Sequence, residues 1–235
     1  FKKNFHSPFS NRQLAILTPP PEQAPHSSLV HMFEVVRQKL GQPQGAFLGN
    51  VTASAWELDF DATLAVVNSS QATRHPSLIV GTAFSFVHLF DFMAEKNLRL
   101  ALPPGSRVME TGGYKNRSRT MPKAELHSLI EKHLGVPREN ILCEYGMSEL
   151  SSQAYDAGAR GFKFPPWARV QIVSPETGRE VADGETGLIR VFDLANVYSV
   201  MAIQTEDIAV RRGDGLELLG RARLAEPRGC SLMTA

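Results

Sequence analysis

Polar side chains gather in the segment EYGMSEL, residues 144–150, where an apolar run ends. Tyr145 and Gly146 precede Ser148, which carries a hydroxyl, and Glu149, which carries a carboxylate. A hydroxyl and backbone N–H groups can hold a phosphate, particularly where a helix begins. A carboxylate supplies the kind of oxygen that Mg²⁺ binds together with phosphate oxygens. The segment therefore has the chemistry to hold a phosphate and a metal ion, although a simple turn would use the same residue types.

Two further segments add chemistry suited to a nucleotide. Gly112 and Gly113 follow an apolar run, and paired glycines let the backbone approach a flat ring closely because no side chain intervenes. Asp207 can accept hydrogen bonds from the two hydroxyls of a ribose, and Arg221 can pair with a ribose or phosphate oxygen. Taken singly, these residues also suit a turn, a loop acid and a solvated arginine. Taken together with the first segment, they suffice for a nucleoside monophosphate.

The composition is that of an ordinary globular protein: the 235 residues are 43% hydrophobic and 21% charged, with a formal net charge of +1. The balanced charge argues against non-specific nucleic-acid binding, which needs a basic surface. No apolar run reaches the roughly 18 residues of a membrane span, so none is expected. Two cysteines, Cys143 and Cys230, are too few for a disulfide framework and fit a reducing cytoplasm best.

The first part of the chain alternates short apolar runs with helical patterns. Strands are expected at residues 14–18, 77–81, 107–110 and 140–146, and helices at residues 27–41, 82–97 and 120–135. Strand–loop–helix units of this size predict an α/β fold with a mostly parallel sheet flanked by helices. Such sheets bind ligands at the carboxyl ends of their strands, which is where the polar segments lie.

The pattern changes near residue 165. The later runs are short and rich in β-formers, they are separated by turn sequences such as PETGRE, ADGET and GDG, and they cover residues 169–174, 187–192, 207–212 and 216–220. They predict a small antiparallel sheet or barrel. We therefore expect two domains: an α/β nucleotide-binding part at residues 1–164, and a β-rich subdomain with a C-terminal tail at residues 165–235.

In this order, the segments resemble the adenylate-forming enzymes, in which YGxTE, TGD and GR style motifs line the nucleotide site. The residues within these motifs most resemble one branch, the LuxE-type acyl-protein synthetases of bacterial bioluminescence and their relatives. ETGGYKNRSR and EYGMSELSSQAY are the most specific stretches, and TED stands where the wider superfamily has TGD. The likeness covers nearly the whole chain and is carried by residues 17–32, 107–119, 144–156 and 220–233.

The resemblance implies an ATP-dependent long-chain-fatty-acid ligase that uses Mg²⁺. A fatty-acid carboxylate would attack the α-phosphate of ATP to give acyl-AMP, and the acyl group would move to a cysteine thiol and then to a partner such as an acyl reductase. By resemblance, Ser148 contacts the phosphate and Glu149 holds Mg²⁺, both as catalytic residues. The same resemblance places Gly112, Gly113 and Tyr145 near the adenine, Gly146 in the same nucleotide site, and Asp207 and Arg221 on the ribose.

Cys230, in the segment RGCSL, is the candidate acyl acceptor. The thiolate is the reactive form of a cysteine, and the neighbouring Arg228 would favour it. The acyl-accepting cysteine of the family also lies near the C-terminus. A small residue in a final strand is an equally weighted interpretation. Cys143 is expected in the core.

Other residues have simpler interpretations. His127 and His133 fall among charged neighbours in a helical pattern, and we expect them to be solvated. His31 and His88 fall in apolar helical patterns, and we expect them in the core. The phenylalanines within residues 84–92 are expected to be core as well, and part of them could line an acyl tunnel.

Adenylate-forming enzymes also carry a Ser/Thr/Gly-rich loop around the β- and γ-phosphates of ATP. In the family this loop precedes the segment at residues 17–25, and no such stretch occurs in the sequence. We therefore expect it upstream of Phe1 and expect the α/β part to be incomplete at its N-terminus. The chain as given should then form acyl-adenylate poorly or not at all.

Two alternatives stay open. An acyl- or aryl-CoA ligase would share these motifs and differ in the acyl acceptor. A non-catalytic scaffold that binds a reductase or an acyl carrier would keep the fold without cleaving ATP. The joint presence of Glu149, Asp207 and Arg221 favours an enzyme. The chain length of the acid and the oligomeric state lie beyond the sequence.

Overall fold

The computed structural model describes residues 13–40, 45–53, 55–112, 121–158 and 160–222. The chain separates into two compact units, the first comprising the described residues up to Leu142 and the second those from Cys143 onward. The domain division at residues 164 and 165 stays a prediction. None of the helices in the described ranges has the length and hydropathy of a membrane span.

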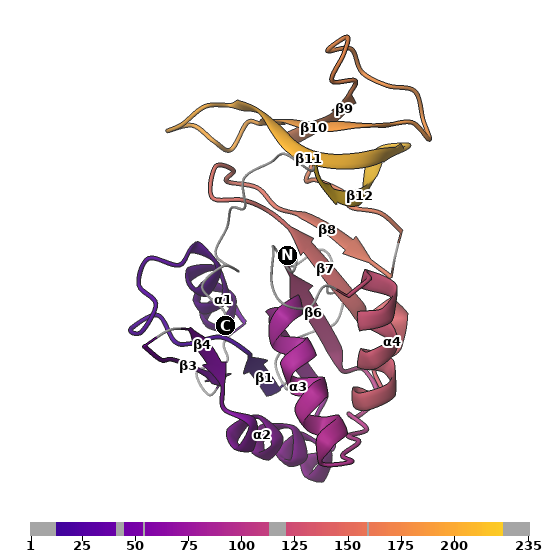
Figure 1. Ribbon diagram of the computed structural model, residues 1–235. Helices are drawn as coiled ribbons and strands as arrows, with labels where there is room; N and C mark the ends of the chain where they lie inside the picture. Colours follow the sequence, from indigo (N-terminus) through magenta and orange to yellow (C-terminus); the bar gives the residue numbers. More distant parts are fainter. Residues whose placement is uncertain (1–12, 41–44, 54, 113–120, 159, 223–235) are drawn as a thin grey trace. The chain divides into compact units, whose positions relative to one another are not determined.

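The first unit is built on parallel strands, as the alternating pattern predicts. Its strands lie in the order β2-β1-β5-β6, and all three neighbouring pairs are parallel. In the register, Leu14 is opposite Leu78, and Leu78 is opposite Arg107. The strands are β1 (Gln13–Ile16), β2 (Ala46–Phe47), β5 (Ser77–Thr82) and β6 (Arg107–Thr111) (Figure 1).

Each helix of this unit begins or ends at a residue that suits the position. Ser27, Asp59 and Thr82 are N-caps whose side-chain oxygens accept hydrogen bonds from backbone N–H groups at 3.3, 2.9 and 3.0 Å. Gly135 ends the last helix with φ of 65°, the left-handed conformation favoured by glycine. The helices are α1 (Ser28–Lys39), α2 (Phe60–Thr73), α3 (Ala83–Glu95) and α4 (Lys123–Leu134).

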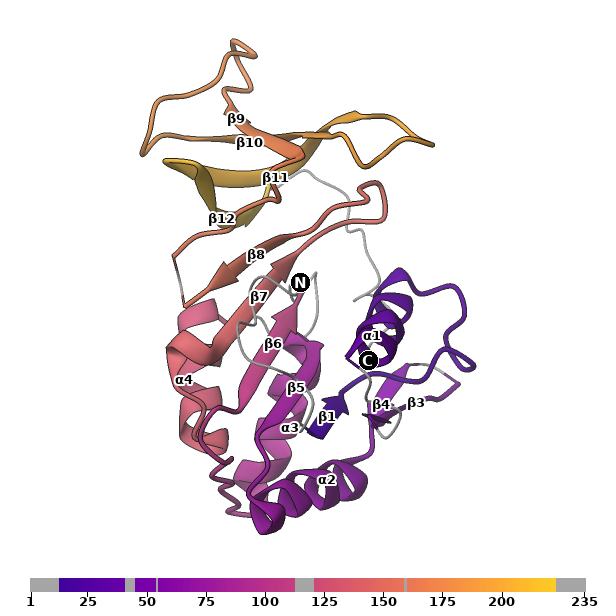
Figure 2. The same ribbon diagram turned by 180° about the vertical axis from the view of Figure 1, so that it is seen from behind.

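The core of the first unit lies between one face of the sheet and two of these helices. Alternate strand residues, among them Ala15, Ile79 and Val108, pack in one cluster with the apolar residues of α3 and α4. Figure 1 shows α3 in front of the strands, and Figure 2, from behind, shows β5 in front of α3. Each fully buried large side chain contributes roughly 1.5–3 kcal/mol. Three of the four phenylalanines expected in the core are there, because Phe84, Phe86 and Phe90 are at most 4% exposed, whereas Phe92 is only partly buried.

The region between α1 and β5 contains elements that the sequence patterns did not predict. Besides β2 and α2, it holds an antiparallel hairpin of β3 (Gly49–Val51) and β4 (Trp56–Leu58). A Cβ atom on Gly49 would lie 2.6 Å from the backbone carbonyl carbon of Thr18, so the chain passes there too closely for any other residue. A short 3₁₀ helix, η2 (Arg138–Asn140), follows α4.

The second unit contains the antiparallel sheet that the later runs predict. Its strands lie in the order β12-β11-β10-β9, and every neighbouring pair is antiparallel. The unit also holds β8 (Ala154–Ala157), and β7 (Ile141–Tyr145) runs into it from the first unit. The sheet strands are β9 (Ala168–Val173), β10 (Thr186–Asp193), β11 (Ala202–Arg212) and β12 (Gly215–Arg221).

The predictions for four histidines are wrong. On α4, His127 and His133 are only 1% and 5% exposed, because they share the buried face of the helix with Leu126 and Ile130. The charged residues that suggested solvation occupy the opposite face. His31 on α1 and His88 on α3 are exposed, since each falls between the buried positions of its helix.

Candidate functional site

Tyr145 and Asp207, two of the predicted site residues, are in direct contact. Tyr145 ends β7 and is 7% exposed, and its hydroxyl donates a hydrogen bond of 2.8 Å to Oδ2 of Asp207 on β11. The edges of Phe162 and Phe164 pack against the tyrosine, with ring centroids 6.0 and 6.3 Å away. Burial, and then the negative charge of Asp207, raise the pKa of Tyr145, so the phenol stays protonated and remains a donor.

Arg221 lies on the other side of the same carboxylate. In the register of β11 and β12, Arg221 is directly opposite Asp207, and its Nε lies 3.5 Å from Oδ1 of Asp207. Nη2 of Arg221 donates a hydrogen bond of 2.8 Å to Oε2 of Glu206. The guanidinium therefore lies between two carboxylates, hydrogen-bonded to Glu206 and close enough to Asp207 for an ion pair.

An irregularity in the β11–β12 pairing supports this alignment. Ile208 is opposite Gly220, but the next residue, Ala209, is opposite Leu218, so β12 contains one extra residue there. Gly220 has φ of 134°, a conformation that residues with a side chain rarely adopt. A β-bulge changes the direction of neighbouring side chains. This bulge directly precedes Arg221 in the chain.

Ser148 and Glu149 occupy the middle of a tight turn. The backbone N–H of Leu150 donates to the carbonyl oxygen of Met147 at 3.1 Å, which closes a four-residue turn. Ser148 and Glu149 are exposed, as is Gly146 before the turn, and the Ser148 hydroxyl donates to Oε2 of Glu149 at 3.3 Å. No helix starts at this turn, so its amides would have to bind a phosphate without a helix dipole behind them.

The side-chain oxygen atoms at the turn are suitable ligands for a hard cation. The side chains present two kinds of oxygen, a hydroxyl and an exposed carboxylate, side by side on Ser148 and Glu149. Mg²⁺ takes oxygen ligands and is usually bound through one or two carboxylates with phosphate oxygens and water completing its shell. A single exposed carboxylate therefore suits Mg²⁺ that arrives with a nucleotide better than a preformed metal cage.

Of the remaining predicted site residues, the structure describes only Gly112. Gly112 follows β6 in the first unit and is exposed, with φ of 74°. That left-handed conformation explains the glycine at this position. Gly113 and Cys230 lie outside the described residues, so the prediction of an adenine contact and that of an acyl acceptor both stay predictions. Cys143 is buried, as expected.

A buried pair of side chains at the end of β6 was not recognised in the sequence. Glu110, 6% exposed, lies two residues before Gly112, and its Oε1 is 3.6 Å from Nε2 of His127 on α4. The pair joins the end of the strand to the helix that follows it. The apolar residues Leu126 and Ile130 mark the buried face of α4, and His127 lies next to Leu126 and three residues before Ile130. That spacing in the sequence would have placed His127 on the buried face.

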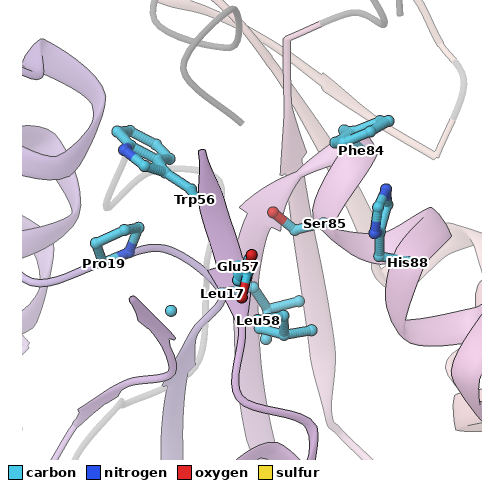
Figure 3. A pocket seen from close by; sticks show the side chains of 9 residues that line it. Leu17, Pro19, Trp56, Glu57, Leu58, Phe84, Ser85 and His88 are labelled. Carbon is cyan, nitrogen blue, oxygen red and sulfur yellow. The ribbon is translucent and has the colours of Figure 1, made fainter. Parts of the chain in front are cut away.

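A small pocket lies beside Phe84 in the first unit (Figure 3). Its volume is about 20 Å³, which is enough for about one water molecule. The rings of Phe84 and His88 pack beside it, tilted by 56° with centroids 4.2 Å apart. The pocket is therefore too small to serve as an acyl tunnel in this conformation. Its lining residues are Leu17, Pro19, Gly49, Trp56, Glu57, Leu58, Phe84, Ser85 and His88.

Two further residues missed in the sequence, Asp193 at the end of β10 and Asn196 in the loop after it, contact the turn or the residues directly after it. Asp193 accepts hydrogen bonds from the backbone N–H groups of Ser151 and Ser152. Asn196 donates to the backbone carbonyl oxygen of Glu149. The available signal was an aspartate at the end of an alternating strand with an asparagine three residues later, which is typical of a structured turn.

Comparison with known proteins identifies the family of the chain. The family described as acyl-protein synthetase, LuxE, matches residues 2–235. The long-chain-fatty-acid–luciferin-component ligase of Aliivibrio fischeri is 23% identical over 190 residues, which is 76% of this chain and 50% of that protein. The ligase of the same name from Vibrio harveyi is also 23% identical over 190 residues, covering 77% and 50%. The chain therefore spans about half the length of these curated relatives.

Solved structures of adenylate-forming enzymes share the fold. ATP-bound MatB from Rhodopseudomonas palustris aligns with a TM-score of 0.57 at 16% identity, over 91% of this chain and 41% of that chain. O-succinylbenzoate coenzyme A synthetase (MenE) from Bacillus subtilis aligns with a TM-score of 0.56 at 18% identity, over 93% and 45%. At these identities the likeness establishes the fold and nothing more specific.

Proposed function

The chain belongs to the acyl-protein synthetase LuxE family, and on that premise we propose that it supplies the nucleotide-binding residues of an ATP-dependent long-chain-fatty-acid ligase. The ligase would activate the acid as acyl-AMP and transfer the acyl group to a protein cysteine. The names of the curated relatives, both fatty-acid ligases, support the class of reaction. The whole reaction remains a proposal because the chain spans about half of those relatives.

The observation that carries the proposal is the cluster of Tyr145, Asp207 and Arg221. The Tyr145 hydroxyl holds the carboxylate of Asp207 by a hydrogen bond of 2.8 Å, and Arg221 forms an ion pair with it at 3.5 Å, so the carboxylate is oriented before a ligand binds. A carboxylate can accept about four hydrogen bonds, which leaves capacity for the two hydroxyls of a ribose. Asp207 is half-buried and therefore open to a ligand on one side. A preorganised acceptor costs less ordering when the ligand binds.

The first step joins two anions. A carboxylate oxygen of the fatty acid forms a bond to the α-phosphorus of ATP, the bond from that phosphorus to the bridging oxygen breaks, and pyrophosphate leaves. In this proposal Ser148 and the amides of its turn contact the α-phosphate, and Glu149 and the phosphate oxygens hold Mg²⁺. Bound Mg²⁺ supplies positive charge that offsets the repulsion between the reacting groups. Gly112 and Gly113 would line the adenine, with Tyr145 near it and Gly146 in the same site.

The second step releases AMP. The thiolate of the acceptor attacks the acyl carbon, the bond between that carbon and the phosphate oxygen breaks, and AMP leaves with its electron pair. We assign the acceptor role to Cys230, with Arg228 two residues earlier in the sequence favouring the thiolate. An acyl reductase as the next acceptor, and a reducing cytoplasm as the setting, belong to the same proposal.

The test is a reaction of the full-length protein with ATP, Mg²⁺ and a panel of carboxylic acids. Acid-dependent exchange of pyrophosphate into ATP, strongest with long-chain acids, is the expected result, and the variant Asp207→Asn should lose most of it. A full-length protein that cleaves no ATP with any acid would favour the non-catalytic scaffold. Pyrophosphate exchange by residues 1–235 alone should be slower than exchange by the full-length protein, which tests the expectation that this chain forms acyl-adenylate poorly.

The acyl acceptor is tested separately. If Cys230 accepts the acyl group, Cys230→Ser should abolish a hydroxylamine-labile acyl-protein and leave pyrophosphate exchange unchanged. The matched control is Cys143→Ala, which removes the buried cysteine and should leave acylation in place. An acyl- or aryl-CoA ligase would instead consume coenzyme A and be insensitive to the substitution at Cys230.

A further inference from the structure

The turn that carries Ser148 and Glu149, and the residues directly after it, are held by two buried side chains at and just after the end of β10. Asp193 is the last residue of β10 and is 0% exposed, and Asn196 is 9% exposed. Neither belongs to a motif used above, and neither carboxylate nor amide is open to a ligand. Their partners show what they do.

Asp193 makes hydrogen bonds with four donors. Oδ2 accepts from the backbone N–H groups of Ser151 and Ser152 at 3.0 and 2.8 Å. Oδ1 accepts from the Ser152 hydroxyl at 2.8 Å and from the N–H of Ala195 at 3.1 Å. A buried carboxylate is very costly unless its hydrogen bonds are all made. The chain directly after the turn is therefore held in the one conformation that supplies these donors.

Ser152 extends this network to Trp167, the residue directly before β9. Nε1 of Trp167 donates to the Ser152 hydroxyl oxygen at 3.0 Å, while the same hydroxyl donates to Asp193. Hydrogen bonds arranged in such a chain polarise and strengthen one another. The backbone N–H of Leu194, the residue after Asp193, also bonds to Trp167, donating to its carbonyl oxygen at 3.1 Å.

Asn196 contacts the turn itself. Its Nδ2 donates to the backbone carbonyl oxygen of Glu149 at 2.9 Å and to that of Val200 at 2.7 Å. Its Oδ1 accepts from the Ser151 hydroxyl at 3.0 Å. Both amide hydrogens and the oxygen are thus used. The backbone of Glu149 is fixed from one side, and its side chain stays exposed on the other.

We infer that Asp193 and Asn196 are positioning residues for the phosphate- and Mg²⁺-binding turn, acting through the backbone at Glu149, Ser151 and Ser152. This inference rests on the proposed function. The ribose-binding group, Asp207 with Tyr145 and Arg221, makes its own contacts and uses neither residue. Loosening the turn should therefore weaken binding of the phosphate and leave binding of the nucleoside intact.

The test compares two ligands that differ by one phosphate. The affinities of the full-length protein for AMP with Mg²⁺ and for adenosine are measured by titration calorimetry. Asn196→Ala should weaken AMP binding about tenfold, as expected for a lost buried hydrogen-bond pair, and change adenosine binding less than about twofold. Val197→Ala, at a 73% exposed position beside it, is the matched control and should change neither.

Several outcomes would overturn the inference. Equal loss of AMP and adenosine binding by Asn196→Ala would indicate a merely structural role, and unchanged AMP binding would show that the turn needs no such support. If Asn196→Ala does not fold, Ser151→Ala can replace it, because it removes only the hydroxyl that donates to Asn196. Ser151→Ala must then weaken AMP binding, by a smaller factor, and leave adenosine binding unchanged. Failure of the unsubstituted protein to bind either ligand would instead count against the proposed function.

Discussion

The hydroxyl of Tyr145 donates to Oδ2 of Asp207 at 2.8 Å, although the two residues are 62 positions apart in the sequence. The bond joins the end of β7 to the middle of an antiparallel sheet strand. Its donor is a buried phenol with a raised pKa, and its acceptor is half-buried. The contact therefore orients the aspartate without neutralising it by proton transfer.

Replacing Tyr145 by phenylalanine isolates that hydrogen bond. Tyr145→Phe keeps the ring between Phe162 and Phe164 and removes the donor to Asp207. We expect adenosine and AMP to bind about tenfold more weakly and the free energy of unfolding to fall by about 1–2 kcal/mol. Calorimetry and urea unfolding measure the two effects. Tyr198→Phe, at a fully exposed tyrosine, is the control, and unchanged nucleoside affinity in Tyr145→Phe would contradict the role given to the bond.

A lysine at position 221 tests whether geometry or charge matters there. Arg221→Lys keeps the positive charge but loses the planar group that lies between Asp207 and Glu206. We expect about tenfold weaker AMP binding, with a change in stability of at most about 1 kcal/mol because the pair is partly exposed.

Arg212→Lys is the matched control for this substitution. Arg212 lies on the same strand pair, its Nη2 is 2.7 Å from Oε2 of Glu217, and both side chains are about half exposed. Equal effects of the two substitutions on AMP binding would show that the site at Arg221 has no special geometry.

Burial of His133 predicts a loss of stability in mild acid. Burial, followed by the nearby charges of Lys132 and Arg99, lowers the pKa of His133 below its ordinary value of 6.5. As the pH falls through 6.5, the unfolded chain binds a proton before the folded one does, so the free energy of unfolding decreases. The stability is fully present above that pH and is lost progressively below it.

The measurement is the thermal midpoint at about pH 7.5 and about pH 5.5, a range that spans the titration of an ordinary histidine. His133→Phe keeps a ring against Phe90, which lies 5.3 Å away between centroids, and should reduce the loss of stability on acidification. His75→Phe, at an exposed position, controls for the substitution itself. An undiminished loss in His133→Phe would place its cause elsewhere.

The sequence predicted the elements whose patterns are strong and local. Runs such as residues 77–81 and 107–110 became β5 and β6, and the later runs became the antiparallel sheet, because apolar period and turn residues specify them directly. The strands β2, β3 and β4 escaped prediction because they have only two or three residues. The helix α2 escaped because two of its three buried residues, Thr63 and Ser70, are polar, so the apolar period is weak. The histidines on α4 were misjudged from their neighbours in sequence, when the residues three and four positions away decide which face is buried.

The sequence indicated only some of the residues around the candidate site, for a related reason. Tyr145, Asp207 and Arg221 were singled out because side chains with ligand chemistry occur in recognisable motifs, and the structure brings the three together. Asp193 and Asn196 were not, because they act on backbone groups more than 40 positions away and present nothing to a ligand. A sequence shows which side chains can contact a nucleotide, but the residues that fix a turn become visible only with the hydrogen bonds.

Glu149 offers the most direct test of the metal-binding hypothesis. Glu149→Gln keeps the size of the exposed side chain and removes the charge that would hold Mg²⁺, while Asn196 still binds the backbone carbonyl oxygen. We expect the Mg²⁺ concentration for half-maximal pyrophosphate exchange to rise about tenfold or more, with adenosine binding unchanged. Glu176→Gln, at an exposed position in a turn of the second unit, is the control. If Glu149→Gln lowered the rate without any change in the Mg²⁺ requirement, the carboxylate would serve another purpose, and the metal would have to be held by the phosphates and other oxygens.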